Sequence, residues 1–176
     1  MAEKPKGELR VPPQSIDSEK ALLGSIMLRP EGLIEVTDLL TPDSFYTGKH
    51  QTIYRAMFEL FTKGDPIDLL SVSGHLDERG LLENAGGRSY LVGLVDATPS
   101  AGNLKYYAQV VHRKHSLRNL IGAADDVAEL GFNEVDELED ILERAEKRVF
   151  EVTSSPSFHA FTPIAESLGE AWDRLE

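Results

Sequence analysis

Two glycine-containing segments could cradle a phosphate, and neither fits a nucleotide-binding loop. The signature of such a loop is a glycine, any four residues and then Gly-Lys-Ser/Thr. The one Gly-Lys pair, Gly48-Lys49, is followed by His50, and Asp43 occupies the position of the first glycine. Gly86-Gly87-Arg88-Ser89 follows a predicted helix-ending connector rather than a strand, so it indicates a turn into a helix. We therefore expect no nucleotide-binding loop among these residues.

Histidines are the candidates for metal binding. His112 and His115 lie three residues apart and could share one face of a helix. Arg113 and Lys114 stand between them and repel a cation, and no third ligand lies in register, so we expect no metal site. The other three histidines are isolated in the sequence, which favours surface or capping roles: His50, His75 and His159.

Nucleophiles and paired carboxylates do not form a recognisable constellation either. No serine stands in a Gly-x-Ser-x-Gly elbow, and the chain has no cysteine, which excludes disulfides and thiolate chemistry. Asp125-Asp126 and Glu139-Asp140 lie on predicted helices, where adjacent side chains point about 100° apart and are poorly placed as an acid–base pair. We expect no catalytic residue, no metal ligand and no cofactor in this segment.

The composition is that of a folded, acidic domain. The 176 residues are 41% hydrophobic and carry a net charge of −12, which argues against a stand-alone nucleic-acid binder because phosphate neutralisation needs clustered Lys and Arg. The opening residues MAEKPKGELR are too polar for a signal peptide. No apolar stretch approaches the roughly 20 residues that cross a bilayer. With the lack of cysteine, these features predict a cytoplasmic protein.

Charge is divided between two adjacent segments. From Asn133 to Glu151 there are eight acidic and three basic residues. From Asn103 to Asn119 every charged residue is basic: Lys105, Arg113, Lys114 and Arg118. We interpret this as charge complementarity within or between helical hairpins. The alternative is a basic strip that touches nucleic acid, where Tyr106 could stack on a base; Tyr107 lies on an apolar stripe and is predicted to be core.

Apolar residues spaced three and four apart predict an all-α fold, with no strand alternation. The helices predicted for the first part of the chain are one from Ser15 to Pro30, a short one over residues 33–40, one over 49–62 stopped by Gly64, one from Asp68 to Gly80, and one over 90–95 before Pro99.

A far longer helix is predicted over residues 103–130, against a usual length of about 11–12 residues. Gly131 stops it, and Asp136 with Glu139 forms a capping-box-like pair at the start of the next helix. Because the loop between them is short, the two helices are predicted to be antiparallel neighbours.

A linker and a last helix follow. Thr162-Pro163 is a good helix start, and the helix has nothing within its own sequence to pack on. It either folds back on the main domain or docks on another subunit, and the linker favours docking in trans. Its apolar stripe, the candidate docking site, is Ile164, Leu168, Trp172 and Leu175.

The predicted fold is thus a compact helical bundle followed by a long antiparallel helical hairpin, a flexible linker and a terminal docking helix. The predicted division is a flexible leader (1–13), a globular helical subdomain (14–101), a helical hairpin (102–152), a linker (153–161) and a docking helix (162–176). From the residues alone, such a chain is a helical protein-interaction domain.

Four segments in order resemble the N-terminal domain of DnaB-type replicative helicases, over about residues 12 to 150. The usual Glu-Ala of the opening run is replaced by Asp17-Ser18, which also suits a helix N-terminus. The segments are Pro12-Pro13-Gln14-Ser15-Ile16-Asp17-Ser18-Glu19-Lys20-Ala21-Leu22-Leu23-Gly24; Phe45-Tyr46 with His50, Ile53 and Tyr54; Arg79-Gly80-Leu81-Leu82-Glu83 with Gly86-Gly87 and Tyr90-Leu91; and Thr98-Pro99-Ser100-Ala101 with Asn103 and Tyr106-Tyr107-Ala108.

The resemblance implies a parent protein that is a ring-shaped hexamer and unwinds duplex DNA with ATP. Its motor domain would lie beyond Glu176, hold ATP and magnesium, and make the DNA contacts. The present domain would form a collar where primase docks, a helicase loader is a further expected partner, and the last helix would pack on the neighbouring motor domain. An unrelated helical protein–protein interaction adaptor is the alternative.

The resemblance also implies that hairpins pair between subunits. The residues expected to mediate self-association are Leu117, Leu120, Ile121, Leu138, Ile141 and Leu142.

Overall fold

The structure is a computed structural model that describes residues 11–154, and those residues form helices and turns without a strand. The all-α prediction is confirmed. The predicted docking helix, most of the linker and most of the leader lie outside the described residues. The elements, with η for a 3₁₀ helix, are α1 (Ile16–Leu28), η1 (Pro30–Glu35), η2 (Pro42–Ser44), α2 (Gly48–Lys63), α3 (Leu69–Glu78), α4 (Gly87–Asp96), η3 (Ala101–Asn103), α5 (Leu104–Leu130) and α6 (Leu138–Thr153).

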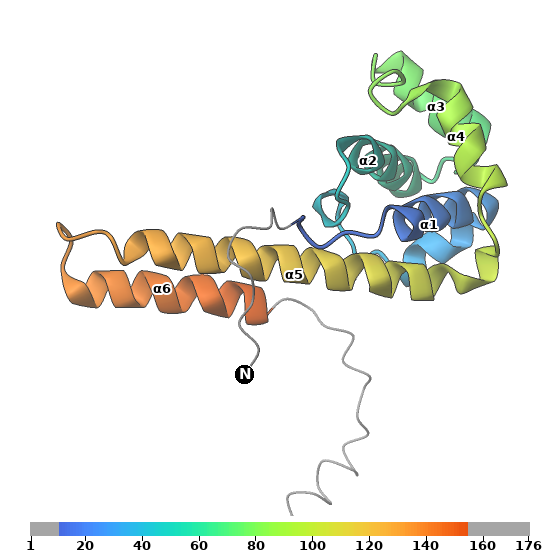
Figure 1. The fold of residues 1–176 in the computed structure, drawn as a ribbon. Coiled ribbons are helices and arrows are strands. Elements are labelled where there is room, and N and C mark those ends of the chain that lie inside the picture. The colour runs from blue at the N-terminus through green and yellow to red at the C-terminus, as the bar shows by residue number, and fades with distance from the viewer. Residues whose placement is uncertain (1–10, 155–176) are drawn as a thin grey trace, which may run out of the picture.

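Residues 16–103 form a compact head, and α5 with α6 forms a hairpin that projects from it (Figure 1). Within the head, α1 packs against α2, α4 and η1, and it also lies along the first half of α5. The side chains of Leu22, Leu23 and Ile26 on α1 are completely buried there. The core is therefore built around α1, and α5 completes it with Leu104, Ala108 and Val111.

A close crossing of α1 and α4 depends on a glycine. A Cβ atom at Gly24 would clash with the Leu94 carbonyl oxygen and with the Thr98 hydroxyl. The Thr98 hydroxyl in turn donates to the Leu94 carbonyl at 2.7 Å. Glycine at this position thus lets the two helix backbones approach at a distance that a side chain would prevent.

The helix boundaries of the head follow the predicted stop and start signals closely. Gly64 ends α2 in the left-handed region, with φ of 75°. The Asp68 carboxylate caps α3 by accepting a hydrogen bond from the Ser71 backbone N–H at 2.8 Å. This bond stabilises the ionised form and lowers the pKa of Asp68.

The short α-helix predicted over residues 33–40 is wrong. The chain forms the 3₁₀ helix η1 and then a turn, with the Val36 N–H bonded to the Leu33 carbonyl three residues earlier. Three of its apolar residues, Leu33, Val36 and Leu40, are buried, whereas Ile34 is 64% exposed. Pro30 starts the segment without an N–H donor, and the tighter 3₁₀ turn brings the three buried side chains onto the core over a short distance.

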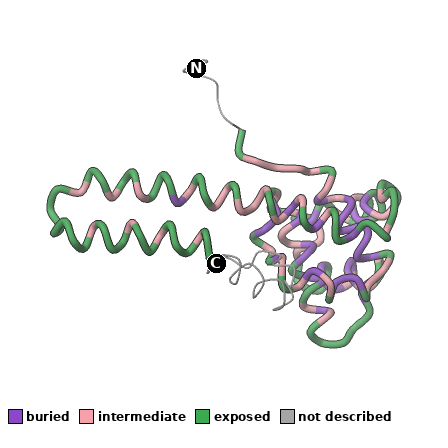
Figure 2. The backbone as a smooth tube through the Cα atoms, turned by 90° about the horizontal axis from the view of Figure 1, so that it is seen from below, coloured by how far each residue is buried: buried purple, intermediate pink, exposed green. Residues whose placement is uncertain are grey.

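The hairpin is unequal, because α5 has 27 residues and α6 has 16. In Figure 1, α6 runs antiparallel to the half of α5 that lies away from the head. Figure 2 shows buried residues concentrated in the head, while the hairpin is mostly exposed. None of the helices in the described part of the chain is long and apolar enough to cross a membrane.

Charge complementarity between the basic and acidic arms of the hairpin is not what joins them. The basic half of α5 packs on the head, where Lys105 pairs with Glu35 at 3.4 Å. The ion pair that links the two helices has the opposite polarity, from Arg148 of α6 to Asp126 of α5 at 2.5 Å. Complementarity within one hairpin is therefore wrong, because α6 is too short to reach the basic segment, and complementarity between hairpins stays a prediction.

The predicted capping box at α6 is also wrong. Glu137 occupies the N-cap position and its side chain makes no cap hydrogen bond. The Asp136 carboxylate instead accepts from the Asn133 amide at 2.7 Å and from Arg144 at 3.0 Å. These two donors hold Asp136 in the turn, one residue before the position that caps a helix.

Candidate protein-docking surface

The hairpin carries an apolar surface that it does not bury on itself. Leu138 and Leu142 of α6 are 67% and 59% exposed, and Val149 continues their spacing of four and seven residues. On α5, three large side chains are also exposed: Leu117, Leu120 and Ile121. We call these six residues the hairpin stripe. Full burial of a leucine stabilises by about 1.5–3 kcal/mol, so the stripe leaves much of that stabilisation unrealised in a single chain.

A different set of residues closes the hairpin. Ala123 of α5 is buried, with 1% of its surface exposed, and Ile141, Ala145 and Val152 of α6 are half-buried. Since α5 is the helix that packs against α6, we assign these four residues to the contact between the two helices, together with the Arg148–Asp126 ion pair. Ile141, predicted to mediate self-association, thus differs from the other five predicted residues, which are all exposed.

Beside the hairpin stripe, α6 has a shallow groove of about 580 Å³. Its apolar lining comes from Leu142, Ala145 and Val149, together with Phe150, which is 66% exposed. Phe150 was not among the predicted site residues, although it lies one position beyond Val149. Phe132 and Val135 in the turn were not among them either, and they are 87% and 94% exposed. Apolar residues in a short turn were the signal that could have drawn attention to them.

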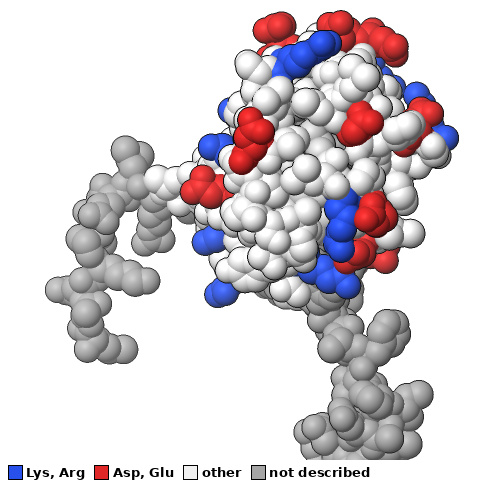
Figure 3. All heavy atoms as spheres, turned by 90° about the vertical axis from the view of Figure 1, so that its right-hand side faces the viewer, with Lys and Arg blue, Asp and Glu red and all other residues white. Residues whose placement is uncertain are grey.

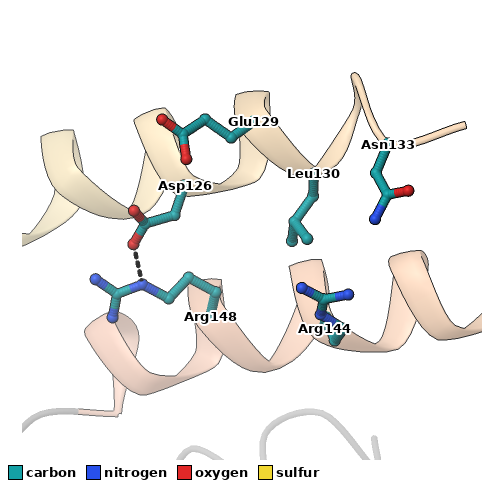
Figure 4. Close-up of a pocket in the computed structure, with 6 residues that line it drawn as sticks. All are labelled: Asp126, Glu129, Leu130, Asn133, Arg144 and Arg148. Atoms are coloured by element: carbon teal, nitrogen blue, oxygen red, sulfur yellow. Dashed lines mark hydrogen bonds and ion pairs between the residues drawn. The ribbon is translucent and has the colours of Figure 1, made fainter. Parts of the chain in front are cut away.

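Ion pairs line the groove between the two helices (Figure 4). Arg148 reaches from α6 to the Asp126 carboxylate, a contact that raises the pKa of Arg148. Leu130 and Arg144 extend toward the space between the helices in the same view. Arg144 is itself paired with Asp136 at 3.0 Å. The cations of this groove are thus already neutralised within the chain.

A buried series of hydrogen-bonded polar side chains joins helices of the head. Glu19 and His50 are 2% and 0% exposed, and the Glu19 Oε2 atom lies 2.6 Å from His50 Nδ1. The other ring nitrogen lies 2.6 Å from the Tyr90 hydroxyl. Glu19 Oε1 accepts the Tyr46 backbone N–H at 2.8 Å. A carboxylate only accepts hydrogen bonds, so the Nδ1 atom carries the proton, and the series joins α1, α2 and α4.

The surface or capping role predicted for His50 is therefore wrong. Glu19, His50 and Tyr90, the three side chains of this hydrogen-bonded series, belong to segments that carry the family resemblance. The sequence alone did not show that they contact one another. The role predicted for His75 is wrong too, since it is 9% exposed and lies 2.7 Å from Glu59. This hydrogen bond is the main cause of the lowered pKa of Glu59, and Arg79 on the same carboxylate adds to it.

Arg118 fixes the direction of the hairpin relative to the head. Its guanidinium donates to the Ser44 carbonyl at 2.7 Å and to the Pro13 carbonyl at 2.9 Å. It also lies 5.6 Å from the centre of the Tyr46 ring. Arg118 is thus engaged with the head and is not available to a nucleic-acid phosphate. Figure 3 shows both signs of charge scattered around a largely uncharged centre at the end of the head that faces away from the hairpin.

The other candidate metal-binding side chains do not come together in the structure. No group of three or more metal-ligating side chains occurs among the described residues. His112 is half-buried and lies near Ser116, whereas His115 faces Asn119 at 3.0 Å. Burial is the largest cause of the lowered pKa of His115, and the Arg118 charge adds to it. The predicted docking residues Ile164, Leu168, Trp172 and Leu175 lie outside the described residues.

The described residues thus form a helical domain with a buried-core head and a hairpin that carries an exposed apolar stripe. A family model described as the DnaB-like helicase N-terminal domain matches residues 11–113. The chain belongs to this family. The match covers the head and the first third of α5, and the resemblance read from the sequence is confirmed.

Similar proteins of known name agree with this assignment. The replicative DNA helicase DnaC of Bacillus subtilis (strain 168) is 42% identical over 95% of this chain and 37% of that protein. The replicative DNA helicase DnaB of Geobacillus stearothermophilus is 39% identical over the same shares of the two proteins. The present chain thus spans little more than a third of the length of these relatives.

Solved structures show the same fold. The crystal structure of the N-terminal domain of the DnaB helicase from Mycobacterium tuberculosis matches with a TM-score of 0.76 and 34% identity. The match covers 80% of this chain and 99% of that one. A DnaB-like replicative helicase, described together with its interactions with primase, matches with a TM-score of 0.67 and 28% identity. It covers 88% of this chain and 35% of that chain.

Proposed function

We propose that this chain is the non-catalytic N-terminal collar domain of a hexameric, ATP-dependent replicative DNA helicase. The observation that carries this proposal is the hairpin stripe, which is exposed in one chain and has the residue types and spacing of a helix–helix interface. Membership of the family sets aside the alternative of an unrelated adaptor. The domain pairs with a second copy through the hairpin, and such pairs build the ring.

Primase is the proposed partner of the collar. Support comes from the DnaB-like helicase whose solved structure is described with its interactions with primase. A helicase loader is a second proposed partner. ATP, magnesium and DNA bind to the motor domain of the parent protein, and the helix over residues 162–176 docks on a neighbouring subunit. The lack of cysteine supports a cytoplasmic location.

The self-association proposal is tested by replacing one leucine of the stripe. Leu142→Glu places a charge where the proposed interface excludes water, and we expect the dimer to weaken about tenfold or more, which corresponds to about 1.4 kcal/mol. Leu70→Glu is the matched control, because Leu70 is 74% exposed on α3 of the head. Light scattering across a dilution series measures the dissociation constants.

Two results contradict the proposal. One is a chain that stays monomeric at the highest concentration, and the other is equal weakening by Leu142→Glu and Leu70→Glu. Circular dichroism checks that α6 remains helical. Leu138→Glu, at the first position of α6, gives a second variant that disturbs the α5 contact less. Primase binding is tested by a pull-down with the intact hexamer, and no retention of primase contradicts that part.

A further inference from the structure

Among residues 11–154, no helix lies beside half of α5 on the side away from the head. The Arg148–Asp126 pair sets the register of the hairpin, so α6 runs antiparallel along α5 and reaches its end at Thr153 opposite the middle of α5. The other half of α5 packs on α1 through Leu104, Ala108 and Val111. Its opposite face is open to solvent.

This open face is amphipathic. Tyr106, Val110, Arg113 and Leu117 recur at intervals of four, three and four residues, which places them on one face of the helix. Tyr106 is 63% exposed and Leu117 39%, while Val110 is half-buried and Arg113 is exposed. We call these four residues the proximal face. A tyrosine and two aliphatic side chains in solvent are typical of a surface that another helix covers.

The proximal face lies in a basic environment. No acidic residue occurs between Asp96 and Asp125, so α5 contributes only positive charge here. Lys105 pairs with Glu35 of η1, and Arg118 turns toward the head. Arg113 and its neighbour Lys114 have no ion pair within the described part of the chain. Two of the four cations are therefore left for a partner with negative charge.

We propose that, in a chain not assembled with a motor domain, the segment over residues 162–176 folds back and covers the proximal face. The segment has 15 residues, and the stretch of α5 from Leu104 to Arg118 that α6 leaves uncovered also has 15. The α6 helix runs along α5 in the direction of this stretch and ends at Thr153. The eight residues from Ser154 to Phe161 provide a connection to it.

The chemistry of the segment complements that of the face. Its apolar residues Ile164, Leu168, Trp172 and Leu175 match the tyrosine and aliphatic side chains on α5. It carries four acidic residues against one basic residue: Glu166, Glu170, Asp173 and Glu176 against Arg174. The outer surface of α6 is the poorer site, because the helix from Leu138 to Thr153 carries five acidic residues against three basic ones, and its net negative charge repels the acidic segment.

The fold-back gives the last helix two alternative sites. In the assembled ring it docks on a neighbouring subunit, and in the free chain it shields Tyr106 and Leu117 from solvent. Because Leu117 also belongs to the hairpin stripe, the folded-back segment competes with the second copy at that end of the stripe. The inference concerns contacts within one chain, so it stands separately from the proposed self-association.

Trp172 is the single tryptophan of the chain and reports directly on this contact. We expect its fluorescence in the 176-residue chain to be blue-shifted relative to the chain unfolded in guanidinium, and the shift to be independent of protein concentration. Tyr106→Ala and Arg113→Glu, each in the proximal face, shift the emission back toward that of the unfolded chain. Arg55→Glu is the matched control, because it makes the same charge change on an exposed position of α2.

A second measurement uses the absence of cysteine. A bimane label on Gln109→Cys, one position from Val110 on the exposed side of α5, is quenched when Trp172 lies beside it. The same label in a Trp172→Phe chain regains its fluorescence. Emission of Trp172 equal to that of the unfolded chain overturns the proposal. A blue shift or quenching that appears only as concentration rises also overturns it, and assigns the face to a second copy.

Discussion

The head and the hairpin are built from the same amphipathic helices but use them in different ways. In the head, the large apolar side chains of α1 turn inward, and Leu22, Leu23 and Ile26 have no exposed surface. In the hairpin, Leu138 and Leu142 remain more than half exposed, and Ala123 is the buried residue at the contact of the two helices. The head thus buries its large apolar side chains within one chain, whereas the hairpin leaves a stripe of them in solvent.

Polar groups show the same contrast. The head buries Glu19 and His50 and gives both of them partners at 2.6 Å. The hairpin places its ion pairs at the surface, where Arg144 and Asp136 are about half exposed. Buried pairs are costly to break, because the remaining partner cannot reach water, whereas exposed pairs exchange their bonds with solvent. The difference implies that substitutions of similar type have unequal effects in the two regions.

The largest expected effect is the loss of the buried histidine. His50→Ala leaves the Glu19 carboxylate buried without its ring partner, and we expect the free energy of unfolding to fall by about 3–5 kcal/mol. The hairpin counterpart, Arg144→Ala, breaks an exposed ion pair and is expected to cost at most about 1 kcal/mol. Urea unfolding followed by circular dichroism measures both. Adding Glu19→Gln to His50→Ala recovers part of the loss, since no buried charge then remains; equal losses in the two regions contradict the comparison.

A pair of glycine substitutions gives effects of opposite sign. Gly24→Ala forces α1 away from the Leu94 carbonyl of α4, and we expect a loss of about 1–3 kcal/mol or more. Gly122→Ala, in the middle of α5, meets open space and is expected to stabilise the helix by about 0.5–1 kcal/mol. Thermal unfolding of the two variants beside the unsubstituted chain distinguishes them. A loss at Gly122 similar to that at Gly24 shows that the hairpin packs as tightly as the head.

The smallest effect concerns the starts of α3 and α6. Asp68→Ala removes the cap of α3 and is expected to cost about 1 kcal/mol at pH 7, while Glu137→Ala, at an N-cap without a side-chain bond, changes little. The pKa of Asp68 is lower in the folded chain than its ordinary value of about 3.9. The contribution of Asp68 is therefore present above pH 4 and disappears as the pH falls through the folded pKa. Unfolding measured at pH 7 and below pH 3 checks this, and an Asp68→Ala cost that stays constant with pH contradicts it.

Local signals in the sequence predicted most helix boundaries. Gly64 ends α2 and Asp68 caps α3 because the left-handed conformation of the one and the short carboxylate of the other act within a few residues. The predicted cap of α6 failed although the residues involved are near in sequence. Asn133 and Arg144 both donate to the Asp136 carboxylate, and these bonds hold Asp136 in the turn before the N-cap position.

The apolar residues of the candidate docking surface were predictable in part, because helical spacing is also a local property of the sequence. Helical spacing identified apolar stripes on α5 and α6, but α6 has two adjacent stripes, and spacing does not say which of them meets α5. The structure places Ile141 at that contact and leaves Leu138 and Leu142 exposed. The spacing of the charges likewise did not show that the basic half of α5 lies on the head.

The sequence by itself determined the all-α class, the long helix before Gly131 and the family, because periodicity, helix-breaking residues and ordered motifs are all local properties of the chain. Tertiary structure alone decided that Glu19, His50 and Tyr90 meet, since they are brought together from three helices and each residue is ordinary in its own segment. It also decided which apolar side chains stay in solvent. Burial depends on which helices pack together, and that choice is made by the whole chain.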